Sequence, residues 1–524
     1  MKKKTGLFEK LFPAMALKRN IAKARLDRFR SLNSTSGSRH RYQIGATSLN
    51  INSEVADNIV SIREQIRNFE LKNGNISGPF RRIKKNVVGH GIRLNAEITA
   101  DENGEIPRIT EKQSEAANAA VEKYFDIWNR QADKRLMLQF YGSDGIQGMV
   151  EHALLRDNES IIVGRTSPRP DRIIPYCLEV LESDRLQTPP GLINDPMVEN
   201  GIRFDFEGVP KSYYFLKEHP GNTISAAFKD GDYEEVPAYN DNGTKKVIFL
   251  FNPIRPEQIR AVSLLAAGLE DIQDADRYME AEKLAALEDA CMFGTVTTDD
   301  VDGWDSASNL PSGNDEYDRI HEFSPNEIKY LHPGEKLDVH RPMRPGTQFE
   351  AFIEQIWRGP ANALDVPPEI FLQNWKGMNY SNARTVLLQF YATCRERQRF
   401  LIDYFCYHVY ENVFRGFVAK GLVQAPSFFS RKHDWLKHSW IAPGWQWVDP
   451  AKEASGKETE VNMGIENLSD IMLSQGSDPR VKMERRAKEK RFIKDLEAKY
   501  NITMFDAAPE NQKKSVQTGD KDDE

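Results

Sequence analysis

The sequence predicts an α+β protein in which long helices and a strand-rich segment occupy different parts of the chain. The chain has 524 residues, enough for several domains. Apolar residues recur at three- and four-residue steps in 52–74, 110–139 and 381–420, a spacing typical of amphipathic helices. Short runs rich in β-branched and aromatic residues, separated by Gly, Pro and Asn, dominate 150–252 and predict strands.

Residues 1–51 predict a basic arm. Gly, Ser and Asn fill residues 32–50, and the cations of the arm are Lys18, Arg19, Lys23, Arg25, Arg28, Arg30, Arg39 and Arg41. Arms of this composition usually become ordered only in an assembly. We therefore expect an extended or partly helical arm that wraps a neighbouring molecule.

Residues 52–255 predict a mixed α+β domain. After the helix at 52–74, the stretch GPFRRIKKNVVGHGIRLNAEI indicates a second helix, a glycine turn and a strand. The glycine-rich stretch YGSDGIQG, at 141–148, follows the helix at 110–139, and we interpret it as a loop. The strands predicted after it are ESIIVGR, IPYCLEVLE, GIRFDFEG, SYYFLKEH and KKVIFLFN.

Residues 256–290 predict one long helix with Pro256 near its start, where proline is well tolerated. The later part of this helix is strongly acidic. Its only cations after residue 269 are Arg277 and Lys283, and its acids are Glu270, Asp271, Asp274, Asp276, Glu280, Glu282, Glu288 and Asp289.

The loop-rich residues 291–346 predict a small α/β insert, closed by the strands EIKYL and KLDVHRP. A shorter helix follows at 347–363. We expect this helix to break near Gly359 and Pro360, because proline removes a backbone donor and crowds the preceding turn.

Residues 364–451 combine a polar, aromatic loop with a long helix. The loop reads NWKGMNY and leads directly into the helix at 381–420, whose start can be capped by Ser381 or Asn382. An aromatic, proline-marked connector then leads to the C-terminal part of the chain.

Charge separates the C-terminal part from the rest. Residues 452–510 predict a charged helical region, and residues 511–524 predict a disordered acidic tail. The net charge is −7 and the pI is about 5.9. Proteins that grip nucleic acid tightly are usually basic, so any contact with DNA must be loose or confined to small patches.

The sequence lacks the motifs of common catalytic and metal sites. It contains no GxxxxGK[ST], HExxH, CxxC or GxSxG pattern, and no apolar stretch of the roughly 18 residues that a membrane span needs. Cys394 and Cys406 have apolar neighbours on a predicted helix and are interpreted as small core residues. We therefore expect no enzyme activity, no cofactor, no metal and no membrane contact.

One carboxylate cluster leaves an alternative open. Glu179, Glu182 and Asp184 stand near a strand end, where such groups could hold Mg²⁺ in a metal-dependent nuclease. They could equally form a solvated strand exit paired with Arg185, which is the interpretation we favour because no lysine–carboxylate pattern follows.

Several segments, taken in order, resemble a known family. The chain is similar to tailed-bacteriophage portal proteins of the lambda-like family from about Leu11 to Asn501, and departs from their simplest pattern at 300–316 and after 501. The segments that carry the resemblance are LFPAMALKRNIAKARLDRFRSL, SGPFRRIKKNVVGHGIRL, FNPIRPEQIRAVSLLAAGL and VPPEIFLQNWKGMNYSNARTVLLQFY.

The resemblance implies a portal fold assembled as a ring, usually of twelve subunits. Its parts would be long wing and stem helices, a small α/β clip and a helical C-terminal crown. By position, these are the wing at 52–255, stem helix 1 at 256–290, the clip at 291–346, stem helix 2 at 347–363, the tunnel loop and wing helix at 364–451, and the crown at 452–510.

The resemblance also implies a function and a set of partners. The ring would form the channel at one capsid vertex through which double-stranded DNA is packaged by terminase and later ejected into the tail. It would nucleate procapsid assembly in the host bacterial cytoplasm. The implied partners are other copies of the chain, DNA without sequence specificity, the large terminase subunit, the major capsid and scaffold proteins, and head–tail connector proteins.

Four residues of the tunnel loop are the implied DNA contacts: Trp375, Lys376, Asn379 and Tyr380. Lys376 would meet phosphate transiently as a point charge, and Gly377 would let the loop bend. Trp375 and Tyr380 could instead anchor the loop on the wing. Arg384 is interpreted as an intersubunit salt-bridge partner.

Two further sets of charges complete the implied channel. If one face of stem helix 1 lines it, an acidic wall repels DNA and keeps contact weak; the alternative is an ordinary solvated face. Crown cations could touch packaged DNA or pair with Glu484 and Glu489 along their own helix. The stem residues are Glu270, Asp271, Asp274 and Glu280, and the crown residues are Arg485, Arg486 and Lys490.

Overall fold

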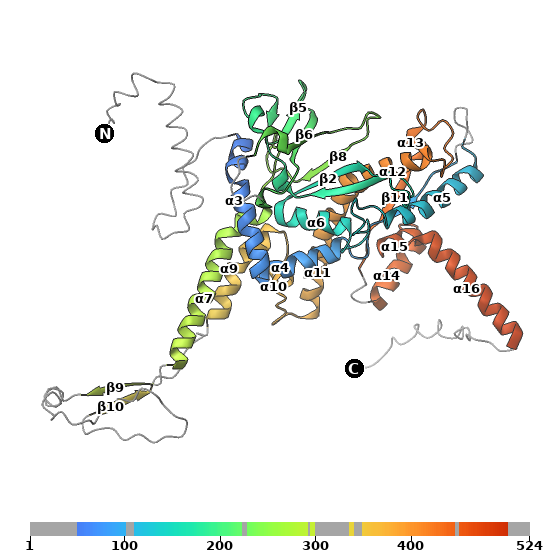
Figure 1. Ribbon diagram of the computed structural model, residues 1–524. Helices are drawn as coiled ribbons and strands as arrows, with labels where there is room; N and C mark the ends of the chain where they lie inside the picture. The colour runs from blue at the N-terminus through green and yellow to red at the C-terminus, as the bar shows by residue number, and fades with distance from the viewer. Residues whose placement is uncertain are drawn as a thin grey trace, which may run out of the picture.

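The computed structural model describes residues 50–100, 109–222, 228–291, 294–298, 335–339, 348–445 and 450–500. Nearly all of the predicted arm, the predicted strand EIKYL, the insert at 300–316 and the acidic tail lie outside these residues. Three parts are distinguished: an α+β body, a hairpin of two helices that projects from it, and a set of C-terminal helices (Figure 1).

The first elements of the body follow the predicted order of two helices and a strand. α3 (Ile51–Lys72) and α4 (Gly74–Val87) each begin at an asparagine whose side chain accepts a backbone hydrogen bond. Gly91, at φ +112°, then turns the chain into β1 (Arg93–Ala96). A side chain at this glycine would also collide with Tyr141, so glycine is required there.

The next helix is shorter than predicted. α5 (Glu111–Asn129) starts with a capping box between Thr110 and Gln113, but it ends ten residues before the expected position 139. The carbonyl and side-chain oxygens of Asn129 accept hydrogen bonds from the backbone N–H groups of Phe140 and Tyr141, at 2.9 and 2.8 Å. These bonds close residues 130–139 into a compact turn region instead of a helix.

The interpretation of YGSDGIQG as a loop is wrong for its second half. α6 (Ile146–Asp157) begins inside this stretch. Gly148 is needed because a Cβ there would lie 1.9 Å from the backbone oxygen of Ser143. The buried Gln147 accepts from Ile92 N and donates to Ile92 O, at 3.0 and 2.9 Å, and so fixes the helix to the glycine turn. These glycines therefore mark close packing.

Two antiparallel sheets form the strand-rich part of the body, and side chains from both make the smaller of two apolar cores. Their strand orders are β3-β2-β8 and β4-β5-β6-β7; β4 and β7 were not predicted. The bounds are β2 (Glu159–Thr166), β3 (Tyr176–Leu181), β4 (Val198–Glu199), β5 (Ile202–Phe204), β6 (Pro210–Leu216), β7 (Tyr233–Pro237) and β8 (Val247–Phe251). Short 3₁₀ turns connect them at Ser183–Arg185, Pro190–Leu192, Pro220–Asn222 and Asp230–Asp232.

The long helix predicted at 256–290 starts thirteen residues later than expected. A 3₁₀ turn (Leu264–Gly268) leads into α7 (Leu269–Cys291). The preceding residues are held in another conformation, because Ala261 N donates to the buried Glu159 carboxylate at 2.8 Å. Glu257 also has φ +63°, which is incompatible with a right-handed helix.

Beyond α7, β9 (Gly294–Thr298) pairs antiparallel with β10 (Glu335–Val339), which agrees with the predicted strand KLDVHRP. α9 (Phe349–Ala363) returns along α7 to the body (Figure 1). The expected break near Gly359 and Pro360 is wrong, since α9 continues through both residues. α10 (Pro368–Leu372) follows.

The long helix after the polar loop is continuous but not uniform. α11 (Tyr380–Leu401) passes through a π-helical turn (Ile402–Cys406) into α12 (Tyr407–Ala419). Its N-cap is Asn379, whose side-chain oxygen accepts from Asn382 N at 2.9 Å, so the predicted caps Ser381 and Asn382 are wrong. Cys394 and Cys406 are fully buried in the larger core, as predicted.

Among the last elements, a strand pairs with β1 at the start of the body, and the helices after it extend away from the body. α13 (Lys432–Trp435) precedes β11 (His438–Ile441), which pairs antiparallel with β1 more than 340 residues earlier in the chain. α14 (Pro450–Asn462), α15 (Leu468–Ser474) and α16 (Pro479–Tyr500) confirm the predicted helical region. In Figure 1, α16 extends away from the body.

Candidate functional site

The helices α7 and α9 form a hairpin held by aromatic contacts and by one close backbone crossing. Tyr278 stacks on Phe349 with ring centroids 5.7 Å apart and meets the edge of Phe352 at 5.0 Å. At the base of the hairpin, a Cβ on Gly268 would lie 2.9 Å from Pro360 Cα. The hairpin is therefore a defined structural unit whose outer sides can carry charge.

The four acids predicted for a channel wall do not share one side of α7. Glu270 and Glu280 are exposed, whereas Asp274 is half-buried and lies 4.0 Å from Arg277. Asp271 turns toward α9, where its carboxylate fills the space beside Gly359. At 100° per residue, Asp271 and Glu280 lie about 180° apart around the helix. A role in lining a channel stays a prediction. Of the four acids, only the exposed Glu270 and Glu280 have side chains free to face such a channel.

The position of Asp271 also changes its chemistry. Burial at the helix crossing raises the pKa of its carboxyl group, and the nearby carboxylates of Asp274 and Glu270 raise it further. Because Asp271 lies against Gly359 of α9, its carboxyl group is less available to an outer negative surface than those of Glu270 and Glu280.

The polar loop lies between α10 and α11 and is attached to α9. Gln373 and Gly377 both adopt positive φ, +56° and +69°, and produce the sharp change of direction. Asn374 donates to the Glu354 carboxylate, and the ammonium of Lys376 forms an ion pair with Glu350. Both acids belong to α9, so the predicted stem helix 2 holds the predicted tunnel loop.

The predicted loop residues differ in how available they are. Trp375 and Tyr380 are 42% and 56% exposed, so neither is buried as an anchor in the single chain. Lys376 is also exposed, and its ion pair with Glu350 raises the pKa of its ammonium group. The side chain of Asn379 is used as the N-cap of α11. Contact with DNA stays a prediction for all four.

Arg384 has a partner within its own chain. Its guanidinium lies 3.3 Å from the carboxylate of Glu453 at the start of α14. The expected role between subunits is therefore unnecessary to explain this arginine, which connects the long helix to the C-terminal helices.

The predicted crown cations lie on α16. Arg485, Arg486 and Lys490 are exposed, and the first turns of the helix carry no buried residue. Lys488 pairs with Glu484 at 2.6 Å one turn earlier, as the alternative of pairing along the helix predicts. Contact of Arg485, Arg486 and Lys490 with packaged DNA stays a prediction.

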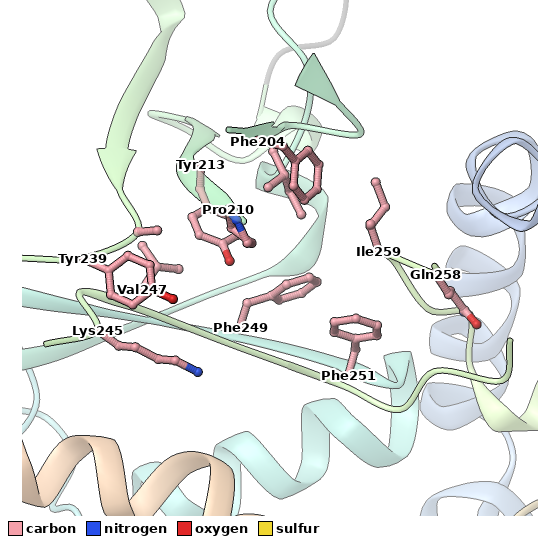
Figure 2. Close-up of a pocket in the computed structure, with 12 residues that line it drawn as sticks. Phe204, Pro210, Tyr213, Tyr239, Lys245, Val247, Phe249, Phe251, Gln258 and Ile259 are labelled. Carbon is pink, nitrogen blue, oxygen red and sulfur yellow. The ribbon is translucent and has the colours of Figure 1, made fainter. Parts of the chain in front are cut away.

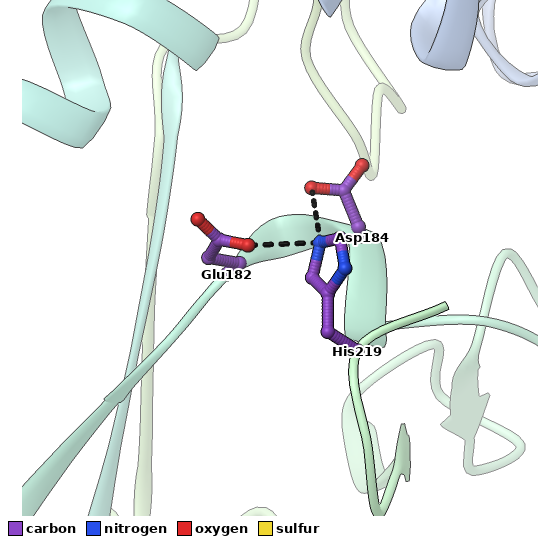
Figure 3. A group of neighbouring side chains, drawn as sticks. All are labelled: Glu182, Asp184 and His219. Atoms are coloured by element: carbon purple, nitrogen blue, oxygen red, sulfur yellow. Dashed lines mark ion pairs between the residues drawn. The ribbon is translucent and has the colours of Figure 1, made fainter. Parts of the chain in front are cut away.

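The three carboxylates of the nuclease alternative are only partly brought together. Glu179 pairs with Lys134 and Arg165, each at 2.8 Å. Glu182 and Asp184 instead meet His219, which was not predicted, and the ligand atoms of these three lie within 4.8 Å of one another. Figure 3 shows the imidazole between the two carboxylates, 2.8 Å from Glu182 and 3.8 Å from Asp184.

Two arginines make this cluster a poor cation site. Arg63 and Arg67 lie 3.0 and 2.6 Å from separate oxygens of Asp184. Burial disfavours the charge of Asp184, but the two guanidinium groups outweigh it and lower the pKa to about 2. Both oxygens are thus committed to cations of the protein. Arg185, the expected partner, donates instead to backbone oxygens of Leu216 and Lys217.

A larger buried ion network, missed from the sequence, surrounds this cluster. Glu159 is fully buried and accepts from Arg260 at 2.7 and 2.8 Å and from Arg63 at 3.0 Å. The network joins α3, β2 and the segment before α7. No local pattern reveals it, because its partners are about 100 residues apart in the chain.

Within the described residues, no helix combines the length and the hydropathy that crossing a bilayer requires. This finding concerns helices only.

Solved structures of gene transfer agent particles contain similar chains. The neck of an empty particle has a chain with a TM-score of 0.47 and 13% identity, matching 80% of this chain and 94% of its own length. The neck of a native particle, computed with C12 symmetry, gives a TM-score of 0.43 at the same identity and coverage.

A curated relative comes from a phage. The probable portal protein of Halomonas phage phiHAP-1 is 24% identical over 428 residues, which cover 80% of this chain and 78% of that protein. The family described as phage portal protein, lambda family, matches residues 37–398, well over half of the chain. The match covers the body from α3 to β8, the α7–α9 hairpin, the polar loop and most of α11. The chain therefore belongs to the lambda family of phage portal proteins.

Proposed function

We propose that copies of this chain form a ring, with twelve subunits as the expected number, at one vertex of a phage capsid. Double-stranded DNA enters the capsid through the hole of the ring and later leaves through it into the tail. The observation that carries the proposal is the projecting α7–α9 hairpin (Figure 1), whose helix α9 holds an exposed loop through the ion pair of Glu350 with Lys376. Membership of the portal family supports the interpretation of this hairpin as part of a portal ring.

Each part of the chain has a place in the proposed ring. The body over 52–255 and the long helix after the loop form the wing. The hairpin α7–α9 forms the stem, β9 and β10 belong to the clip, and the helices from α14 onward form the crown. A hairpin that leaves the body is suited to a stem because its outer sides are free to meet neighbouring copies and DNA.

The negative charge on α7 supports a channel that does not bind the DNA passing through it. Glu270 and Glu280 are exposed on α7, and ring symmetry would repeat them around the hole. Duplex DNA carries one negative charge per roughly 1.7 Å, so such a wall repels it. Weak repulsion lets a polymer slide, whereas a basic wall would arrest it.

The loop supplies a reversible contact against that background. Lys376 is already paired with Glu350, so a passing phosphate must compete with a carboxylate for the ammonium group. Exposed ion pairs are weak, and the exchange is therefore easy in both directions. Trp375 and Tyr380 remain exposed in the single chain and can pack against the loop of a neighbouring copy.

The proposed partners follow from this position in the virion. The clip meets the large terminase subunit during packaging and head–tail connector proteins afterwards. The wing meets the major capsid and scaffold proteins during procapsid assembly, which takes place in the host cytoplasm.

Electron microscopy of the purified chain tests the proposal. We expect rings with a central hole and a mass of about 0.7 MDa, twelve times the 60.0 kDa of one chain. Image averages down the axis should place α7 beside the hole. A monomer that persists at high concentration, or a ring with α7 far from the axis, contradicts the proposal.

A further inference from the structure

An aromatic pocket opens between the two sheets of the body. It has a volume of about 260 Å³ and lies where β5 and β6 face β8 and the segment after it. Figure 2 shows Phe204, Tyr213, Phe249 and Phe251 around the opening, with Ile259 on the side nearest α3. The pocket is continuous with the smaller apolar core, which includes Tyr213.

The pocket leaves aromatic surface in contact with water. Phe204, Phe249 and Phe251 are only half-buried, and Tyr239 on the rim is 42% exposed. The neighbouring Ile254 is 66% exposed. Clustered exposed apolar side chains on a folded protein usually mark a site that another segment covers.

The N-terminal arm joins the body at this pocket. Asn52, in the first turn of α3, donates to Glu257 O and accepts from Ile259 N, both at 3.0 Å. These bonds place the start of α3 against the segment that lines the pocket through Gln258 and Ile259. Forty-nine residues precede the first described residue, Asn50, so the arm must leave the body beside the pocket.

The sequence just before Asn50 fits an aromatic groove. It reads RYQIGATSL, and Tyr42 and Ile44 are its large apolar residues apart from Leu49. Two positions separated by one residue lie on the same face of an extended chain, with Gln43 on the opposite face. Asn50 follows Ile44 by six positions along the chain, a reach of roughly 20 Å when extended.

We propose that the arm of the same chain folds back and inserts Tyr42 and Ile44 into the pocket between β5, β6 and β8. The short tether favours the same chain, because a nearby segment has a high effective concentration at the site. The family match begins at residue 37 and includes this segment, whereas the more distant apolar stretch at 7–17 lies outside it. Docking of the arm is independent of ring formation and gives the wing a fixed N-terminal boundary.

Cysteine cross-linking in the full-length chain tests the docking. Ile44→Cys is combined with Phe204→Cys, a position on β5 that lines the pocket, in a Cys291→Ser background; Cys177, Cys394 and Cys406 are buried. The matched control is Gln43→Cys with Phe204→Cys. After mild oxidation, mass spectrometry should find at least about five-fold more disulfide for Ile44 than for Gln43, since adjacent residues face opposite ways.

A second measurement does not depend on a cysteine in the pocket. We expect Ile44→Asp to raise bis-ANS fluorescence about two-fold relative to Gln43→Asp, because an empty aromatic pocket binds the dye. Equal cross-linking of the two positions, or equal dye binding by the two aspartate variants, overturns the proposal. So does a disulfide that joins two chains, or one that forms from Phe8→Cys in place of Ile44→Cys.

Discussion

The body and the α7–α9 hairpin both carry many charged residues, but they use them in different ways. In the body, Glu159 is fully buried and surrounded by Arg63 and Arg260. On the hairpin, Glu270 and Glu280 are exposed to water, and Glu350 forms an exposed ion pair with Lys376 of the polar loop. Glutamate and basic residues thus form a buried ion network in the body and an exposed, solvated surface on the hairpin.

The difference shows that burial, and not residue type, decides whether a charged residue stabilises the fold or stays available for contacts. A buried ion pair is costly to break, because removal of one partner leaves the other desolvated and unpaired. It therefore fixes the position of α3 relative to β2 and the segment before α7. An exposed charge contributes little to folding and stays available for a polymer or a neighbouring copy.

The largest effect is expected from Glu159→Ala in the buried network. It leaves Arg63 and Arg260 without their shared carboxylate, and we expect unfolding to become easier by about 3–5 kcal/mol. Urea denaturation measures the loss, with Glu280→Ala as the exposed control that should unfold like the wild type. A loss of similar size in both variants would remove the distinction between the two regions.

Acid should weaken the body through Asp184. Its pKa of about 2 lies below its ordinary value, so its contribution to stability is present above about pH 4 and is lost as the pH falls toward 2. The contribution corresponds to roughly 2.5 kcal/mol. Unfolding curves between pH 5 and pH 2 should be steeper in pH for the wild type than for Asp184→Asn. Asp276→Asn on the hairpin is the control and should keep the wild-type slope.

Gly268→Ala tests how closely the hairpin joins the body. The new Cβ would meet the backbone of Pro360, which cannot move as a flexible side chain can, and we expect a loss of about 2 kcal/mol. Gly456→Ala is matched to it, because a Cβ there has no neighbour within 4 Å. That control should be neutral or slightly stabilising. If thermal denaturation finds equal effects, the close crossing of α7 and α9 does not limit this position.

The smallest effect is expected from Lys376→Ala on the exposed loop. Ring assembly should be unchanged, while the salt dependence of DNA retention falls by roughly one phosphate contact per chain. Lys376→Arg keeps the charge and serves as the control. Glu350→Gln should act in the opposite direction, because it releases the ammonium from its carboxylate. Unchanged DNA retention in packaged heads for all three variants means that the loop does not touch DNA.

Much of the secondary structure could be predicted locally. Apolar periodicity placed α3 and the continuous helix from α11 to α12 to within a few residues, since a helix is set by contacts between residues three and four apart. The acidic character of α7 follows from its composition alone. The loop at 374–380 was found from its polar and aromatic residues beside a long helix. The exceptions were positions where distant segments meet.

The chain by itself determined most of the helices and strands and the order of the charges along each of them. Only the tertiary structure decided that Gly148 belongs to a packed helix, that α7 starts at Leu269, and that Asp271 and Glu280 face opposite ways. It also brought His219 to Glu182 and Asp184, and the start of α3 to the aromatic pocket. The physical reason is that periodicity records neighbours along one element, whereas burial and ion pairing depend on which elements meet.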